Sequence, residues 1–103
     1  MKKVLISLPM SDFSDKEIQK NVNMYRGLLE AKGYTAVSDF KEDFESPAIK
    51  DKDLYCLGKR IQKMSVCDAV FFAPDWEKDR MCMAENAVAN LFNINILYDG
   101  DIK

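Results

Sequence analysis

Three carboxylates and a tryptophan stand together in the segment that follows the most apolar stretch of the sequence. This segment runs from Pro74 to Asp79 and contains Asp75, Trp76, Glu77 and Asp79. It follows Ala-Val-Phe-Phe-Ala, which predicts a buried strand, and it precedes a helix that carries Glu85 near its beginning. Because ligands bind at the carboxyl ends of strands in parallel α/β sheets, the segment predicts a site for a polar ligand.

Residue types that are missing narrow the chemistry open to such a site. The 103-residue sequence contains no histidine, which excludes histidine bases, serine–histidine triads and most zinc sites. None of its four glycines stands between a predicted strand and a helix, so the sequence has neither a Rossmann dinucleotide loop nor a Walker A loop. We therefore expect no metal and no cofactor, and any catalysis would depend on carboxylates.

Glu85 is the strongest catalytic candidate. It follows Asp79 near the start of the helix and lies beside the apolar Ala84 and Val88, so its side chain can turn toward the end of the sheet. A partly buried carboxylate there can act as a nucleophile or as an acid and base, whereas most helix glutamates are surface residues. Asp79 can instead be the N-cap of the helix, and Trp76 can either cover the sheet end or stack on a planar ligand.

Composition indicates one globular domain that covers residues 1–103. Hydrophobic residues make up 48% of the sequence and charged residues 31%, with a net charge of −2. The basic residues are scattered, so we expect no nucleic-acid partner. No apolar run approaches the roughly 20 residues of a membrane span, and Val4 to Leu8 is too short for a signal-peptide core. We expect a cytoplasmic protein whose three cysteines form no disulfide framework.

Four short apolar strands alternate with three helices in the predicted fold. The strands are Lys3 to Leu8, Tyr34 to Phe40, Asp68 to Ala73 and Ile94 to Tyr98. The helices are Ser14 to Lys32, Ser46-Pro47 to Ser65, and Asp79 to Phe92. The alternation predicts a three-layer α/β/α fold with a four-stranded parallel sheet in the order 2-1-3-4, flavodoxin-like or Rossmann-like without a glycine-rich loop. Pro9-Met10 and the Pro74 to Asp79 loop would then flank the crevice between strands 1 and 3.

Apolar residues at helical spacing predict the face that each helix buries. They are Ile18, Val22, Tyr25 and Leu29 in the first helix, Leu54, Leu57, Ile61 and Met64 in the second, and Ala84, Ala87, Val88 and Leu91 in the third. Gly33 is predicted to end the first helix, and Asn93 to cap the third in a left-handed conformation.

A set of short motifs runs along nearly the whole chain. Its members are Ile6 to Met10, Asn21 or Asn23 with Tyr25, Gly33-Tyr34, Ile61, Cys67-Asp68, Pro74 to Glu77, and Glu85. This pattern resembles the nucleoside 2-deoxyribosyltransferase superfamily, and most closely its small phage and bacterial branch, the DUF4406 type. That branch ends its first strand in Ser-Gly-Pro-Met and later has Cys-Asp, Pro-x-Trp-Glu and a helix-borne glutamate.

The resemblance implies an enzyme that cleaves the N-glycosidic bond of a deoxynucleoside or its monophosphate, as a deoxyribosyltransferase or an N-hydrolase. It implies Glu85 as the nucleophile that attacks the anomeric carbon and Asp79 as a residue that contacts the base. The other residues of the implied site would bind the ligand or form its walls, and they are Ser7, Pro9, Met10, Trp76 and Glu77. The resemblance also implies a homo-oligomer, for which the region of Met81, Met83 and Phe92 would suit the subunit contact.

Several positions of the implied site differ from the family pattern. Leu8 and Met81 stand where the family has glycine, and Arg60 stands where it has an aspartate that helps to hold the sugar and the nucleophile. A guanidinium cannot accept a hydrogen bond from a sugar hydroxyl, and it would tend to pair with Glu85. The alternative is therefore a relative without catalysis. It would bind a nucleotide or another anionic ligand through Arg60 and the start of the third helix, or act as an interaction module.

Overall fold

A parallel four-stranded sheet forms the centre of the computed structural model, which describes residues 2–11, 13–37 and 48–102. Its strands are β1 (Lys2–Ser7), β2 (Tyr34–Val37), β3 (Ala69–Phe72) and β4 (Asn95–Tyr98). They lie in the order β2-β1-β3-β4, and every pairing is parallel. The predicted fold class and strand order are confirmed, and β1 and β3 are the two central strands.

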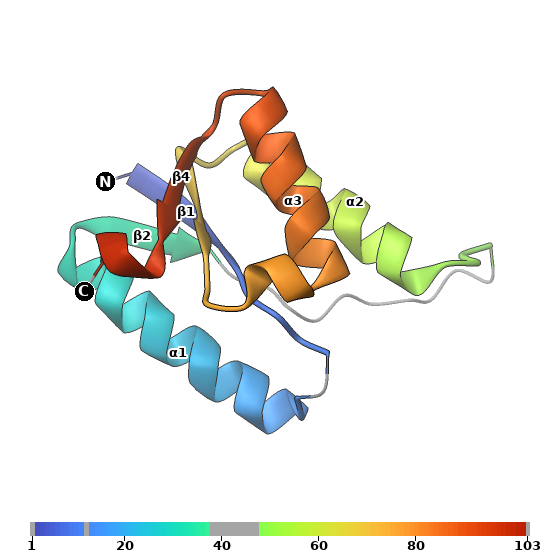
Figure 1. Ribbon diagram of the computed structural model, residues 1–103, viewed down its shortest axis with the longest axis horizontal. Coiled ribbons are helices and arrows are strands. Elements are labelled where there is room, and N and C mark those ends of the chain that lie inside the picture. Colours follow the sequence, from blue (N-terminus) through green and yellow to red (C-terminus); the bar gives the residue numbers. More distant parts are fainter. Residues whose placement is uncertain (1, 12, 38–47, 103) are drawn as a thin grey trace.

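Three helices cover the two faces of this sheet (Figure 1). They are α1 (Asp15–Ala31), α2 (Lys52–Met64) and α3 (Arg80–Leu91). Helix α1 packs on one face, and α2 and α3 lie side by side on the other. Short 3₁₀ turns follow β3 and β4, at Trp76–Lys78 and Asp99–Asp101.

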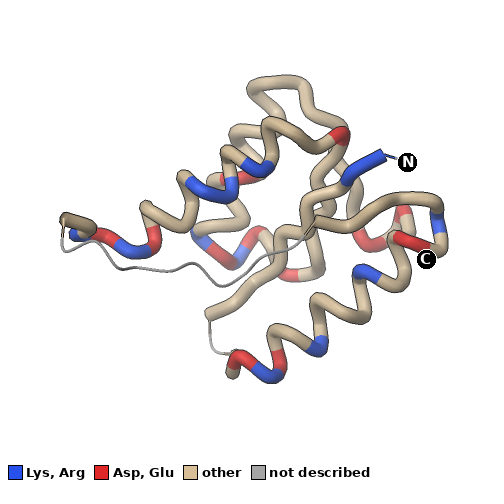
Figure 2. The backbone as a smooth tube through the Cα atoms, turned by 180° about the vertical axis from the view of Figure 1, so that it is seen from behind, with Lys and Arg blue, Asp and Glu red and all other residues tan. Residues whose placement is uncertain are grey.

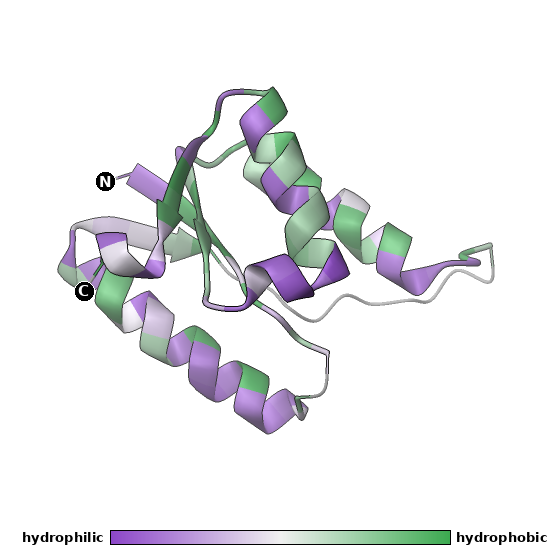
Figure 3. Ribbon diagram, viewed as in Figure 1, coloured by the Kyte–Doolittle hydropathy of each residue, from purple (hydrophilic) through white to green (hydrophobic). Residues whose placement is uncertain are grey.

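The central strands are buried on both faces because successive side chains point in opposite directions. Val4 and Ile6 of β1 belong to the core beneath α1, whereas Leu5 belongs to the core beneath α2 and α3. Phe71 and Phe72 of β3 divide in the same way and are fully buried. Figure 3 shows the hydrophobic residues along these strands, and Figure 2 shows basic and acidic residues interspersed along the helices.

Local capping fixes where the helices begin and end. The Glu17 N–H donates to Ser14 Oγ at 3.2 Å while the Ser14 N–H donates to Glu17 Oε1 at 3.1 Å, so the predicted capping box starts α1. Gly33, with a φ of 90°, and Asn93, with a φ of 56°, occupy the left-handed conformation just after α1 and α3.

Helix α2 begins later than the sequence predicted. Its N-cap is Asp51, whose Oδ1 accepts a hydrogen bond from the Leu54 N–H at 3.0 Å, and its first residue is Lys52. The expected N-cap and first residue, Ser46 and Pro47, lie outside the described residues, as do residues 38–40 of the predicted second strand. In the part of the chain that is described, no helix has the length and apolar composition that a membrane span requires.

The buried faces of α2 and α3 match the predicted ones only in part, since Met64 is buried as predicted and Leu57, Ile61, Ala84 and Val88 are half-buried. Leu91 is 77% exposed and Leu54 is 64% exposed, although both were expected in the core. The residues that α3 buries are Cys82, Glu85, Asn86 and Ala89, and those that α2 buries are Arg60 and Met64. The two helices turn polar side chains inward because these side chains find partners there, Arg60 and Glu85 foremost. By contrast, α1 buries Ile18, Val22 and Leu29 as predicted.

Candidate functional site

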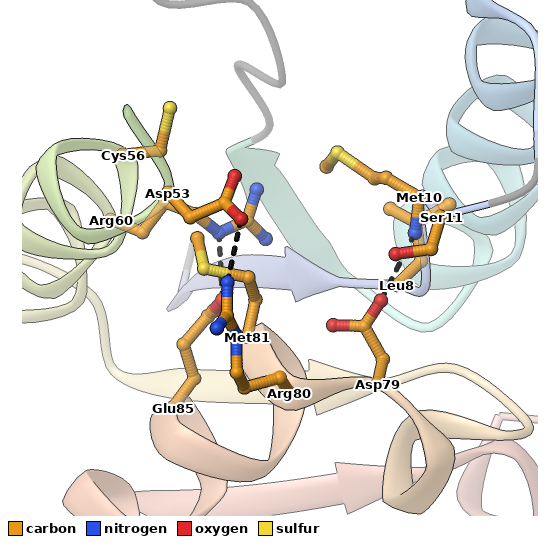
Figure 4. Close-up of a pocket in the computed structure, with 10 residues that line it drawn as sticks. All are labelled: Leu8, Met10, Ser11, Asp53, Cys56, Arg60, Asp79, Arg80, Met81 and Glu85. Carbon is orange, nitrogen blue, oxygen red and sulfur yellow. Dashed lines mark hydrogen bonds and ion pairs between the residues drawn. The ribbon is translucent and has the colours of Figure 1, made fainter. Parts of the chain in front are cut away.

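A cavity of about 320 Å³ lies at the carboxyl ends of the two central strands, β1 and β3. Its walls come from the segment after β1, from α2, and from the N-cap and first turns of α3 (Figure 4). The ten residues that line it are Leu8, Met10, Ser11, Asp53, Cys56, Arg60, Asp79, Arg80, Met81 and Glu85. This is the crevice that the strand order predicted.

Arg60 and Glu85 form a buried ion pair on the inner side of the cavity. Arg60 Nε donates to Glu85 Oε1 at 2.8 Å, and Arg60 Nη2 donates to the Ile6 carbonyl oxygen at 2.9 Å. The side chain of Arg60 is 8% exposed and that of Glu85 is 1% exposed. The guanidinium thus joins α2 to α3 and to the central strand β1, and the pairing expected from the sequence is present.

The surroundings of Glu85 favour its neutral form. Burial raises the pKa of the Glu85 carboxyl above its ordinary value, and the charge and hydrogen bonding of Arg60, together with the nearby Ser7 hydroxyl, oppose that shift. Glu85 Oε2 and the nearby Ser7 Oγ are buried, and neither makes a hydrogen bond within the described part of the chain. Arg60 therefore holds one oxygen of Glu85, and the Ser7 hydroxyl lies close enough to the carboxyl to oppose the rise of its pKa.

Cys82 lies one helical turn before Glu85 and is 1% exposed. Burial raises the pKa of its thiol to about 12, so the thiolate that would act as a nucleophile or metal ligand is suppressed. Within the described residues, no group of three or more histidine, cysteine or carboxylate side chains could hold a metal ion.

Asp79 links the start of α3 to the segment after β1. Its Oδ1 accepts from the Cys82 N–H at 3.0 Å, which makes Asp79 the N-cap of α3 as predicted. Its Oδ2 accepts from the Met10 N–H at 3.4 Å (Figure 4). The Asp79 carboxylate therefore faces the cavity and also bonds to two of the segments that enclose it.

A second ion pair lies between the first turns of α2 and α3. Arg80 Nη2 donates to Asp53 Oδ2 at 2.7 Å, and the two side chains are 77% and 66% exposed. Both residues line the cavity. An exposed pair of this kind is worth little, about 0–1 kcal/mol, so an entering ligand can displace it at small cost.

The residues predicted for the site divide into two groups. Glu85, Asp79, Met10 and Arg60 line the cavity. The other four do not line it. Ser7 is fully buried, Pro9 and Trp76 are half-buried, and Glu77 is exposed. The Trp76 ring lies 5.6 Å from that of Phe72 and 5.9 Å from that of Tyr98, so Trp76 covers the end of the sheet.

Sequence reasoning missed four cavity residues, which are Ser11, Asp53, Cys56 and Arg80. The opposite charges of Asp53 and Arg80, each near the start of a helix, were a usable signal. It was hidden because the second helix was expected to begin several residues too early. Ser11 and Cys56 carry no motif, and their placement depends on the path of the backbone.

Comparison with solved structures supports the fold expected from the motifs. The chain is similar to a 2-deoxyribosyltransferase from the psychrotolerant bacterium Bacillus psychrosaccharolyticus, with a TM-score of 0.67 and 15% sequence identity. The match covers 93% of this chain and 70% of that one. No protein-family model and no curated protein sequence matches the chain. At this level of identity, the likeness shows a shared fold.

Proposed function

We propose that the cavity binds a nucleoside or nucleotide and that Glu85, while paired with Arg60, does not break the N-glycosidic bond of that ligand. The volume of about 320 Å³ falls within the roughly 300–1,000 Å³ of small-molecule sites. Leu8, Met10 and Met81 offer apolar surface to a base, and the charged residues offer partners to hydroxyl, amine or phosphate groups. The deoxyribosyltransferase-like fold supports this class of ligand.

The observation that carries the proposal is the ion pair between Arg60 and Glu85. A carboxylate nucleophile must present a charged oxygen to the anomeric carbon of the sugar. Here Oε1 is bonded to Arg60 Nε at 2.8 Å, and Oε2 is buried inside the protein. A carboxyl that is neutralised by a guanidinium, or protonated because of its burial, is a poor nucleophile in either state.

Opening the pair would not easily restore reactivity. Removing one partner of a buried ion pair costs about 3–5 kcal/mol, because the other charge is left without compensation. A reaction that first had to open this pair would be slower by a factor of roughly 10² to 10⁴. Leu8 and Met81 add bulk on either side of the same space.

Catalysis is the second candidate function, and one observation favours it. Glu85 Oε2 has no hydrogen-bond partner in the described part of the chain, and Glu85 lines the cavity. If a bound sugar reached this oxygen, Glu85 would be the nucleophile and Asp79 would contact the base. The reaction would then be the two-step transfer or hydrolysis of a deoxyribosyl group.

One set of samples tests both candidates. The protein is mixed with each of the common 2′-deoxynucleosides and their 5′-monophosphates, and melting temperature and free base are measured. We expect at least one ligand to raise the melting temperature by several degrees when it is present far above its dissociation constant. We expect no free base above the level in buffer.

The matched control is Glu85→Gln, which keeps the volume of the side chain and an oxygen that can accept from Arg60 but cannot form a glycosyl ester. It should bind the same ligands as the wild type. Release of base by the wild type and not by Glu85→Gln would establish catalysis instead. If no ligand shifts the melting temperature and no base appears, the binding proposal fails as well.

We also propose that copies of the chain associate and that the protein acts in the cytoplasm. Met83 and Phe92 of the expected contact region are 45% and 74% exposed, whereas Met81 is half-buried beside the cavity. Leu91, next to Phe92, is 77% exposed, and neighbouring exposed apolar side chains support a protein contact. No disulfide joins Cys56, Cys67 or Cys82 in the described part of the chain, which supports a reducing compartment.

A further inference from the structure

We propose that Asp79 is a positioning residue, which fixes the width of the cavity by tying the segment after β1 to the start of α3. Its effect on a ligand rests on the binding function proposed above, but the tie itself does not. This role differs from the direct contact with a base that the sequence resemblance implied.

The two oxygens of Asp79 accept hydrogen bonds from two different residues, one close to Asp79 in the sequence and one far from it. Oδ1 accepts from the Cys82 N–H at 3.0 Å, within the first turn of α3. Oδ2 accepts from the Met10 N–H at 3.4 Å, across 69 positions of sequence. Asp79 is 8% exposed, and its bond to Cys82 is buried whereas its bond to Met10 is part-buried.

A helix cap alone would need one of these two oxygens. Asp51 illustrates the simpler case, because it caps α2 through Oδ1 alone, on the Leu54 N–H at 3.0 Å, and is exposed. Asp79 adds the bond to Met10 and is buried. With both oxygens bonded to the backbone, Asp79 acts on a ligand through the segment that it holds.

The tie joins opposite walls of the cavity. Leu8, Met10 and Ser11 form the wall on the β1 side, whereas Met81 and Glu85 belong to α3 (Figure 4). If the bond from Met10 to Asp79 is lost, the Met10 N–H has no acceptor on the α3 side and the two walls can separate. A ligand held between the walls would then lose contact with one of them.

The test separates the tie from the cap by substitution at Asp79. Asp79→Ser keeps one acceptor for the Cys82 N–H, since serine is a good N-cap, and removes the acceptor for Met10. Asp79→Asn keeps the shape of the side chain and one acceptor oxygen in place of two. The control is Asp51→Asn, which makes the same substitution at the N-cap of α2.

We expect amide hydrogen exchange at Met10 to become roughly tenfold faster in both Asp79 variants and to stay unchanged in Asp51→Asn. The affinity for 2′-deoxyadenosine or its 5′-monophosphate, whichever the wild type binds, should fall roughly threefold to tenfold in the Asp79 variants alone.

Unchanged exchange at Met10 in both Asp79 variants would overturn the proposal, and so would equal acceleration in Asp51→Asn. Faster exchange with unaltered affinity for a probe that the wild type binds would also overturn it, because the tie would then not position the ligand walls. If the wild type binds neither probe, the result counts against the proposed binding function. Hydrogen exchange at Met10 then tests the bond between Met10 and Asp79 without a ligand.

Discussion

Glu85 lies in the protein interior with Oε1 bonded to Arg60 and Oε2 unbonded within the described residues. Burial and the neighbouring guanidinium act on it in opposite directions, since burial favours the neutral carboxyl and Arg60 favours the carboxylate. The net effect is a raised pKa. Because the pKa of Glu85 is raised in the folded protein, its protonation changes the free energy of unfolding with pH.

The first prediction concerns pH. A carboxyl whose pKa is higher in the folded than in the unfolded state stabilises the fold fully below its ordinary pKa of 4.5, and this stabilisation is lost as pH rises through the raised value. Glu85→Gln has no such proton. We therefore expect the free energy of unfolding of the wild type, minus that of Glu85→Gln, to decrease steadily as pH rises from about 4.5 toward neutral.

Urea unfolding of both proteins across this range measures the difference, which amounts to about 1.4 kcal/mol for each unit by which the pKa is raised. Groups common to both proteins cancel in the subtraction. A difference that stays constant with pH would mean that the pKa of Glu85 is unshifted. A difference that increases with pH would mean that Arg60 outweighs burial.

Several residues of the site could be predicted from the sequence, but the contacts between them could be predicted only in part. The pairing of Arg60 with Glu85 followed from the family resemblance, which placed Arg60 where the family has an aspartate beside the nucleophile. The double use of Asp79 did not, because its bond to Met10 depends on how closely two loops approach. Trp76 was left with two alternatives, and its packing on Phe72 and Tyr98 was not visible in its type.

At the scale of elements, the turns that stop helices were predicted more reliably than the faces that helices bury. Gly33 and Asn93 adopt positive φ after α1 and α3, as their types indicated. The apolar stripe of α3 was only partly right, because Val88 packs against the core but Leu91 is exposed, while the polar Glu85 and Asn86 are buried. Hydrophobic periodicity carries no information about such polar residues.

The second prediction compares the same substitution, glycine to alanine, at two positions with different backbone conformations. A Cβ added at Gly33 or at Gly58 would meet no atom within 4 Å, so neither substitution creates a clash with neighbouring residues. Gly33 has a φ of 90°, where an L side chain is strained, and Gly33→Ala should destabilise the protein by about 1–2 kcal/mol. Gly58 lies inside α2, and Gly58→Ala should stabilise it by about 0.5–1 kcal/mol.

Thermal unfolding of the two variants beside the wild type provides the measurement, with melting temperatures expected to move in opposite directions. If Gly33→Ala were neutral, the left-handed stop of α1 would not exist in solution. If Gly58→Ala were destabilising, α2 would be bent or would pack against something at that position.

At the scale of the whole molecule, alternation of apolar segments was sufficient for the fold. Four strands separated by helices predict parallel pairing with right-handed crossovers, and the order β2-β1-β3-β4, expected as the simplest arrangement, is confirmed. The location of the cavity follows from the same order, since β1 and β3 are adjacent and their chains leave in opposite directions. The cavity's shape does not, because it depends on where α2 begins.

The third prediction concerns assembly. The chain has a mass of 11.8 kDa, and we expect analytical ultracentrifugation to find a larger species whose fraction increases with concentration. Phe92→Ser should shift this equilibrium toward the monomer, because Phe92 is 74% exposed beside other apolar groups of α3. Phe13→Ser is the control, since Phe13 is 44% exposed and precedes α1, which covers the face of the sheet opposite to α3. Equal behaviour of all three proteins would remove Phe92 from the contact.

The most direct test of the account measures free base by chromatography over many hours. A large excess of wild-type protein is mixed with 2′-deoxynucleosides and with their 5′-monophosphates. The ion pair between Arg60 and Glu85 predicts a rate equal to that in buffer and equal to that of Glu85→Gln. Release of base by the wild type that Glu85→Gln abolishes would contradict the account, and would show that Glu85 reacts in spite of its partner.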